Sequence, residues 1–371
     1  MNPLANDLDH IVAHTPDVWQ ELRGARLFIT GGTGFFGTWL LESFAWANRK
    51  LALGAEALVL TRDPLAIAKK SPHLAAESCI RFHQGDVRDF EFPAGEFPLV
   101  IHAATPASVR LNREEPSQML DIIVRGAQRV LEFATRRGTR KLLLTSSGTV
   151  YGHQPATMTH IPEEYLGGPD TAISTSAYGE GKRLAELLSA IAARHGGLEA
   201  KIARCFAFVG PHLPMDLEYA VGNFVRDGLN GGPIVVHGDG TPYRSYLYAA
   251  DLAIWLWTIL VRGASCRPYN VGSDEDLQIG DLARLVAQAC GEPMQITTLK
   301  QPQQGRAPER YVPRVTRARE ELNLRVWTPL AEAIEKTVAH ACREQRPAVR
   351  IDSPREGRLA PPRGREAKHH A

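Results

Sequence analysis

Residues 26–37 read RLFITGGTGFFG, and this stretch decides the fold class. Residues 26–30 form a short apolar run with a β-branched residue, which is typical of a buried strand. Gly31, Gly34 and Gly37 follow, and residues 38–46 have the apolar periodicity of a helix. A strand, a glycine-rich turn and a helix in this order bring backbone N–H groups and a helix N-terminus up to a bound pyrophosphate. The stretch therefore predicts the first unit of a dinucleotide-binding fold.

The same alternation of short apolar strands and amphipathic helices continues along the chain. Helical patterns cover residues 118–136 and 178–194, and they lie between strand patterns. Strands that alternate with helices predict a parallel sheet with helices on both faces. We therefore expect an α/β protein with a Rossmann-like doubly wound parallel sheet. The further strands are expected at residues 57–61, 80–83, 99–102, 141–145 and 201–206.

The pattern also predicts how the chain is divided. Residues 1–24 read as a helical extension that covers a neighbouring surface, and residues 25–206 as the NAD(P)-binding domain. Glycine and proline become frequent after residue 206, so residues 207–345 are expected to form mainly a smaller α/β substrate-binding lobe, interleaved with the sheet. Residues 346–371 combine proline and charge with few large apolar side chains, which predicts a disordered basic tail.

Composition excludes several classes of protein. The chain has 371 residues, of which 44% are hydrophobic and 23% charged, so it is an ordinary globular sequence. The formal charge is only +2 and the basic excess lies in the tail, where no aromatic residues are interleaved to stack on bases. Neither a nucleic-acid partner nor a membrane partner is expected. The five cysteines are scattered, with no His/Cys cluster at zinc spacing, so we expect reduced thiols, a cytoplasmic protein and no metal.

Further motifs give the sequence a family resemblance. TSSGTVYG at residues 145–152 follows a predicted strand, and YGEGK at residues 178–182 opens a predicted helix. With the glycine loop, these motifs resemble the extended short-chain dehydrogenase/reductase superfamily, in particular its NAD-dependent nucleotide-sugar epimerase/dehydratase branch. The resemblance covers residues 25–340. Other stretches that carry it are GDVRD (85–89), HAATPASV (102–109), the segment 223–253 and YNVGS (269–273).

The resemblance implies a catalytic set of Ser147, Tyr178 and Lys182. In this superfamily the tyrosine takes a proton from a sugar hydroxyl, and the serine hydrogen-bonds the reacting oxygen. A phenol ordinarily titrates near ~10 and is a poor base at neutral pH. Lys182 lies one helical turn after Tyr178, so its positive charge favours the phenolate.

The resemblance also implies a nicotinamide cofactor. The expected contacts are Gly31, Thr33, Gly34, Phe35, Phe36, Arg62, Asp86, Val87, Ala103 and Ala104, together with Tyr178 and Lys182. The second strand ends in Thr61 where an aspartate would accept from the ribose. Arg62 therefore either pairs with the 2′-phosphate of NADP or stacks on adenine while Asp63 serves the ribose. NAD is expected from the habit of the branch, and NADP is the alternative.

For the substrate, the resemblance implies a nucleotide-diphosphate sugar held by Ser147, Thr149, Asn223, Arg244 and Arg306. The two arginines match diphosphate contacts, and Asn223 matches the residue that begins the helix beside the phosphates. The chain departs from the pattern at Ala207, where an asparagine is usual, and at Ile123.

Thr149 separates the possible reactions. The 4,6-dehydratases and glucuronate decarboxylases have a glutamate at this position, whereas SSGTVYG resembles the SSATVYG form of hexose 4-epimerases. Glu163 or Glu164 could replace that glutamate, but two exposed loop carboxylates are the preferred interpretation. We therefore expect a 4-epimerase, with an NADPH-dependent ketosugar reductase as the alternative and a cofactor-binding regulator as the non-enzyme alternative. The family dimerises through the two helices that contain residues 118–136 and 178–194, so a homodimer is expected.

Overall fold

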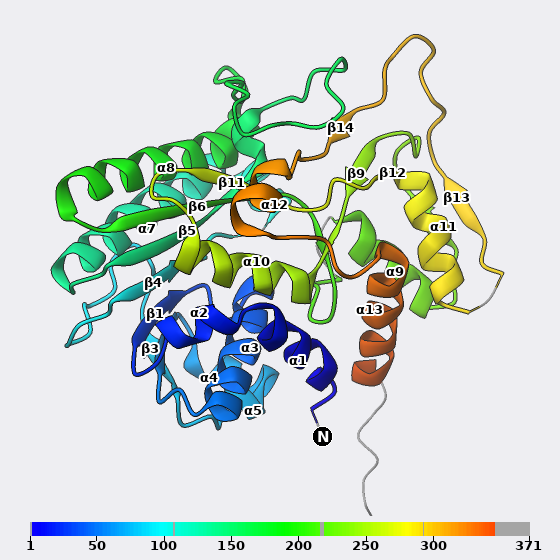
Figure 1. Cartoon of the computed structure of the whole chain (residues 1–371). Helices are drawn as coiled ribbons and strands as arrows, with labels where there is room; N and C mark the ends of the chain where they lie inside the picture. Colours follow the sequence, from blue (N-terminus) through cyan, green and yellow to red (C-terminus); the bar gives the residue numbers. More distant parts are fainter. Residues whose placement is uncertain (1, 107, 216–218, 292, 346–371) are drawn as a thin grey trace, which may run out of the picture.

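The computed structural model describes residues 2–106, 108–215, 219–291 and 293–345, and a seven-stranded sheet lies at its centre (Figure 1). The strand order is β11-β6-β5-β4-β1-β2-β3, and every neighbouring pair is parallel. The expected doubly wound parallel sheet is confirmed. Its strands are β1 (Arg26–Thr30), β2 (Glu56–Thr61), β3 (Ile80–Gln84), β4 (Leu99–His102), β5 (Lys141–Ser147), β6 (Glu199–Cys205) and β11 (Pro268–Val271).

Both faces of this sheet are buried under helices. In β1, Leu27 and Ile29 join one apolar cluster and Phe28 joins the other, because successive side chains of a strand point to opposite faces. One face is covered by α3 (Phe35–Leu51) and α10 (Ala249–Arg262), and the other by α7 (Pro116–Arg136) and α8 (Ala177–Gly196). The uninterrupted apolar strands seen in the sequence are therefore explained by burial on both sides.

Three small sheets accompany the large one, and β9, β12, β13 and β14 of these sheets lie on the right of the view in Figure 1. One has the order β12-β9-β14, and the other two are the pairs β10-β7 and β13-β8. The strands are β7 (Phe208–Val209), β8 (Ile234–Val236), β9 (Tyr243–Ser245), β10 (Leu247–Tyr248), β12 (Asp276–Gln278), β13 (Ile296–Thr298) and β14 (Arg310–Tyr311). The associated helices are α9 (Ala220–Leu229), α11 (Ile279–Ala289), α12 (Thr316–Leu322) and α13 (Leu330–Gln345).

The chain begins with two helices, α1 (Ala5–His14) and α2 (Pro16–Glu21), which pack on α10. Leu8, Ile11 and Trp19 are fully buried, and the rings of Trp19 and Trp257 lie 5.2 Å apart. The residues predicted as a disordered tail, 346–371, lie outside the described residues. The remaining helices are α4 (Pro64–Lys70), α5 (Pro72–Ala75), α6 (Val109–Glu114) and the 3-10 helices η1 (Gly148–Tyr151) and η2 (Ser174–Ser176).

All five cysteines are free thiols, so no disulfide stabilises the fold. Among the described residues, no helix is both long enough and apolar enough to cross a membrane.

Candidate active site

The glycine loop between β1 and α3 is shaped by close backbone contacts. Gly31 has a φ of +75°, and a Cβ there would lie 2.5 Å from the carbonyl carbon of Ala103. A Cβ on Gly37 would lie 2.3 Å from the oxygen of Gly31. A Cβ on Gly34, in contrast, would meet only that oxygen, at 3.5 Å. Gly31 and Gly37 are therefore required for packing, whereas Gly34 leaves open space in front of the helix.

The N-terminus of α3 faces this open space without a side-chain cap. Gly34 is the N-cap residue, and the first turn contains no acidic side chain. Thr33 is exposed, and Phe35 and Phe36 are half-buried on the first turn. An uncapped helix of 17 residues offers free N–H groups and the positive end of its dipole, which together suit a pyrophosphate.

The carboxyl ends of the neighbouring strands supply the other predicted cofactor residues. Ala103 and Ala104 follow β4, and the N–H of Ala104 donates to Thr30 Oγ1 over 3.2 Å. Asp86 follows β3, and the hydrogen bond from Arg88 is the main cause that lowers the pKa of its carboxyl. Val87 is buried, and its side chain packs against Gly126 of α7.

Arg62 and Asp63, at the end of β2, are the two side chains expected near the ribose of the cofactor. Asp63 is the N-cap of α4, and its Oδ1 accepts from the N–H groups of Leu65 and Ala66 over 2.9 and 3.1 Å. One oxygen of this carboxylate therefore caps the helix. Arg62 is exposed, and its positive charge helps to lower the pKa of Asp86. Arg62 is therefore an exposed cation at the end of β2 beside Asp86.

Lys182 is held in the interior beside the end of β5. Its Nζ donates to Thr105 Oγ1 over 2.7 Å and to the oxygen of Thr145 over 2.8 Å, and it lies 5.9 Å from the ring centre of Tyr178. Burial lowers the pKa of Lys182 to about 8. His102 lies nearby, and burial followed by the charge of Lys182 lowers its pKa to about 3, so the histidine is neutral.

The hydroxyl of Ser147 is the centre of the predicted catalytic set. It accepts from the N–H and the hydroxyl of Thr149 over 3.2 and 3.0 Å. Burial raises the pKa of Tyr178, and the neighbouring hydroxyl of Ser147 offsets part of that rise. The structure thus brings Ser147, Thr149, Tyr178 and Lys182 together at the carboxyl end of β5.

Tyr311 is a further member of this cluster that the sequence did not predict. Its phenol lies close enough to Ser147 for that hydroxyl to lower its pKa, which burial otherwise raises, and its ring lies 4.7 Å from the ring of Phe206. Tyr311 belongs to β14 and is paired in register with Arg244 on β9. No spacing in the sequence indicates this contact, because it is created by the pairing of two strands in the small sheet.

The predicted substrate residues differ in how close they come to this cluster. The guanidinium of Arg244 lies 6.0 Å from the ring centre of Tyr311, which places it beside the catalytic set. Arg306 is exposed and pairs with Glu309 over 3.0 Å. Asn223 lies inside the first turn of α9, which begins at Ala220, so the expectation that it begins the helix is wrong. Its side-chain oxygen accepts from Arg226 over 3.2 Å.

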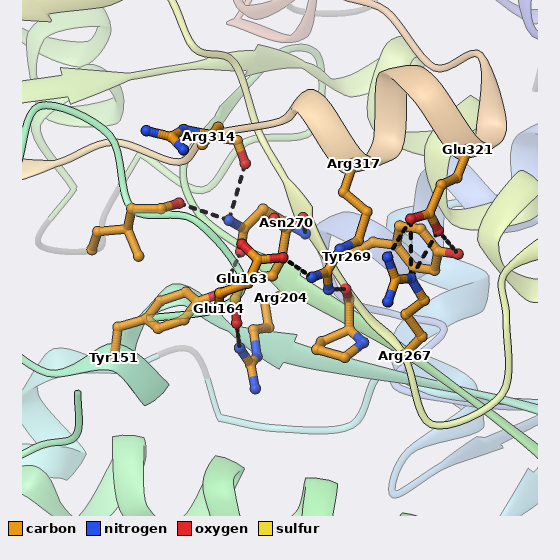
Figure 2. A network of polar contacts seen from close by, with 12 residues as sticks. Tyr151, Glu163, Glu164, Arg204, Arg267, Tyr269, Asn270, Arg314, Arg317 and Glu321 are labelled. Atoms are coloured by element: carbon orange, nitrogen blue, oxygen red, sulfur yellow. Dashed lines mark hydrogen bonds and ion pairs between the residues drawn. The ribbon is translucent and has the colours of Figure 1, made fainter. Parts of the chain in front are cut away.

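The expectation of two exposed loop carboxylates is wrong for Glu163. Glu163 is buried, and its carboxylate accepts from the N–H of Asn270 on β11 over 2.9 Å. Burial is the main cause that raises the pKa of this carboxyl. Glu164 forms an ion pair with Arg317 (Figure 2). Both carboxylates therefore serve contacts with β11 and α12, and Glu163 is buried where the backbone of β11 binds it.

The tyrosine of the TSSGTVYG motif also belongs to the network in Figure 2. Tyr151 is buried, and its hydroxyl donates to Asn270 over 2.7 Å. Arg204 lies 4.8 Å from the ring centre of Tyr151 and forms an ion pair with Glu186 over 2.7 Å. These contacts fix the turn after β5, which carries Ser147 and Thr149.

Comparison with known proteins identifies the family. A sequence profile of the NAD dependent epimerase/dehydratase family matches residues 27–272. The chain belongs to this family. UDP-glucuronic acid decarboxylase 1 of Arabidopsis thaliana is 30% identical over 315 residues, which cover 85% of this chain and 69% of the relative.

Solved structures of epimerases and a dehydratase share the fold of the family. UDP-glucose 4-epimerase of Thermus thermophilus, in complex with NAD, has a TM-score of 0.70 at 26% identity over 85% of this chain and 98% of its own. The dTDP-glucose 4,6-dehydratase of Streptomyces venezuelae, with NAD bound, has a TM-score of 0.73 at 24% identity over 86% and 97%. Members of the family modify nucleotide sugars and use NAD.

The residues of this chain fit such a cofactor. The space beside Gly34 and the uncapped N-terminus of α3 match a pyrophosphate. Ala103 and Ala104 follow β4, which neighbours β1 at the point where the strand order reverses. In doubly wound sheets, a dinucleotide binds at the point where the strand order reverses.

Proposed function

We propose that the chain is a nucleotide-sugar 4-epimerase. The observation that carries the proposal is Thr149, whose hydroxyl donates to Ser147 over 3.0 Å at the position where the dehydratases and decarboxylases of the family have a glutamate. A threonine hydroxyl does not ionise near neutral pH and is a poor general acid or base, so the extra acid/base step of those enzymes lacks its group. Glu163 and Glu164 do not replace it, because they bind Asn270 and Arg317.

The chain's own residues supply the proton transfers of an epimerisation. NAD, when bound, provides the hydride acceptor and a positively charged ring. Tyr178 takes the proton of the sugar 4-hydroxyl, and Ser147 holds the same oxygen through its hydrogen bond. Epimerisation requires that oxygen to lose a proton and later to regain it, and Tyr178 serves both transfers.

Lys182 makes Tyr178 a usable base. Burial raises the pKa of Tyr178, so the phenolate needs positive charge close by. The Nζ of Lys182 lies 5.9 Å from the phenol ring and is fixed by Thr105 and Thr145. The ammonium therefore favours ionisation of Tyr178 without forming an ion pair that would hold the tyrosine away from the sugar.

The two parts of the chain are assigned complementary tasks. We assign residues 25–206 to cofactor binding and catalysis, and residues 207–345 mainly to the nucleotide sugar. Arg244 is proposed to bind the diphosphate beside Tyr311, and Arg306 to reach it from the exposed loop, because arginine forms paired, charge-assisted bonds to phosphate oxygens. Asn223 is proposed as a polar contact from α9.

The helices α7 and α8 support a homodimer. Leu184, Leu187 and Ile191 recur on one face of α8, and together with Leu120 of α7 they are among the exposed large apolar side chains. Leu187→Glu should convert the dimer to a monomer in light scattering. Leu166→Glu, at an exposed leucine outside these helices, is the matched control and should leave the mass unchanged.

The reaction is tested with a panel of UDP-, TDP-, GDP- and CDP-hexoses and UDP-glucuronate, without added cofactor. NMR should show the C4 epimer of one nucleotide sugar, with no net change in nicotinamide absorbance. Loss of carbon dioxide or formation of a 4-keto-6-deoxy sugar would overturn the proposal. Mass spectrometry of the nucleotides released from denatured protein should show NAD.

A ketosugar reductase is the second candidate, and the ribose site favours it. Asp63 is used as the cap of α4 while Arg62 is exposed near Asp86, and such an arginine suits the 2′-phosphate of NADP. Release of NADP, or net consumption of NADPH with a 4-keto sugar, would establish this candidate in place of the epimerase.

A further inference from the structure

Two histidines and a glutamate lie together away from the candidate active site. His212 belongs to the loop after β7, and His340 and Glu344 lie one turn apart on α13. One ligand atom from each of the three side chains can be chosen so that all lie within 4.8 Å of one another. The imidazole rings of His212 and His340 are 4.7 Å apart, and His340 Nε2 lies 3.2 Å from Glu344 Oε1.

The hydrogen bonding of this cluster is incomplete within the described part of the chain. His340 is only 7% exposed, yet its Nδ1 has no partner there, and neither does the buried Nε2 of His212. A buried polar atom without a partner is costly, because it has lost its water. His340 Nδ1 lies on the side of the ring opposite to Nε2, which faces Glu344, so His212 Nε2 is the unpaired atom that is available to a ligand at the cluster.

His340 turns its Nε2 to Glu344 Oε1, and because a carboxylate only accepts, this nitrogen donates a hydrogen bond when no ion is bound. A metal ion binds an imidazole nitrogen that carries no proton, so an ion at the cluster takes the place of this proton.

Charges of both signs surround the cluster. Lys70 and His73 add positive charge near His212 and Arg343 adds it near His340, whereas Glu344 and Glu42 add negative charge near His340. Glu344 is exposed, which leaves its carboxylate free to turn toward an ion.

We propose that His212, His340 and Glu344 form a zinc site that joins the loop after β7 to the C-terminal helix α13. Zn²⁺ prefers nitrogen and carboxylate ligands at about 2.0–2.2 Å, which places tetrahedral ligand atoms about 3.3 Å apart. The pair on α13 already has this spacing, with His340 Nε2 3.2 Å from Glu344 Oε1, and the imidazole of His212 has to turn toward this pair to complete the site. A water molecule completes the coordination.

The position of the site gives it a structural role. The loop is fixed to α3 by the bond from Trp39 Nε1 to the oxygen of Pro211 over 2.9 Å, and α13 packs on β7, β10 and α9. Bound Zn²⁺ therefore stabilises the folded chain by linking its last helix to the element beside the glycine loop.

The test is titration of the full chain with ZnCl2, followed by calorimetry and thermal unfolding. His369→Ala/His370→Ala serves as the background, so that the histidines near the C-terminus do not contribute. One equivalent of Zn²⁺ should bind and raise Tm, whereas MgCl2 should not. His212→Ala and the mild, exposed change Glu344→Gln should each weaken binding at least about tenfold.

The control His153→Ala, at an exposed histidine outside the cluster, should bind Zn²⁺ like the background. The absence of Zn²⁺ binding, or equal affinity in Glu344→Gln, His212→Ala and the control, would overturn the proposal. Binding that disappears in the background itself would place the site at His369 and His370 and would likewise overturn it.

Discussion

The two ends of the candidate site are built in different ways. The catalytic end lies where β5 meets α8, and Lys182 and Ser147 are there only 3% and 5% exposed. The substrate end lies on β9 and on the loop before β14, where Arg306 is exposed and pairs with its neighbour Glu309. The residues proposed for the proton transfers are thus buried in the packed sheet, while Arg306, proposed to bind substrate, lies at the surface.

This difference has a physical cause. A proton transfer needs donor and acceptor within hydrogen-bond reach, and a packed interior provides that precision. Recognition of a diphosphate tolerates more movement, because an arginine side chain can follow the charge. We expect substitutions at the catalytic end to change kcat, and substitutions at the substrate end to change KM.

The largest effect is expected from Tyr178→Phe. Removal of the phenol hydroxyl removes the base that serves both proton transfers, so kcat should fall about 10³-fold while nucleotide-sugar binding remains. Steady-state kinetics and calorimetry measure the two quantities. Tyr165→Phe, outside the cluster, is the control, and an unchanged kcat in Tyr178→Phe would place the reaction elsewhere.

The buried charge of Lys182 should be visible in the pH dependence of stability. The pKa of Lys182 is about 8 in the folded protein and 10.5 for an unperturbed lysine, so the unfolded state binds more protons between these values. The free energy of unfolding should therefore rise, relative to Lys182→Met, by about 2 kcal/mol from about pH 8 to about pH 9.5. Denaturant titrations of the protein and of Lys182→Met at several pH values measure the free energy of unfolding. If it changes with pH in the same way in both proteins, a lowered pKa of Lys182 is contradicted.

The substrate end is compared by two matched substitutions. Arg244→Ala should raise KM about 10- to 50-fold, because a half-buried charge-assisted bond is lost beside Tyr311. Arg306→Ala should raise it only a few-fold, about threefold, because an exposed arginine is screened by solvent. Retention of the cofactor should not change in either variant. Equal loss of cofactor and substrate affinity in Arg244→Ala would rule out a diphosphate contact.

The smallest effect concerns the cofactor's ribose. Arg62→Ala should weaken the binding of NADPH about fivefold and leave the binding of NADH nearly unchanged, because an exposed arginine contributes modestly to a phosphate contact. Fluorescence titration with both nucleotides measures the ratio. An unchanged ratio would remove the structural support for the reductase.

The sequence predicted the large sheet well because its signal is local. The strand that ends at Thr30 and the helix that follows the glycine loop are readable from apolar periodicity alone, and their bounds agree within a few residues. The cluster of Ser147, Thr149, Tyr178 and Lys182 could also be expected from the sequence, through the family resemblance. Its motifs are short and lie on β5, η1 and α8.

The sequence did not predict contacts that join distant segments. Tyr311 reaches Ser147 only because β14 pairs with β9. Glu163 is buried because Asn270 on β11 binds it, which no local pattern reveals. His212 and His340 are likewise brought together by the packing of α13, so an absence of zinc spacing in the sequence did not exclude their cluster.

Asp7 of α1 accepts a hydrogen bond from Tyr248, at the start of α10, and pairs with Lys336 of α13, both over 2.8 Å. A single carboxylate therefore ties α1 to α13, the last helix among the described residues. The amides of α1 and α13 should become protected from hydrogen exchange together, and a shortened version that lacks α1 should also lose protection in α13. Trimming the first helix thus acts on a helix more than 300 residues further along the chain.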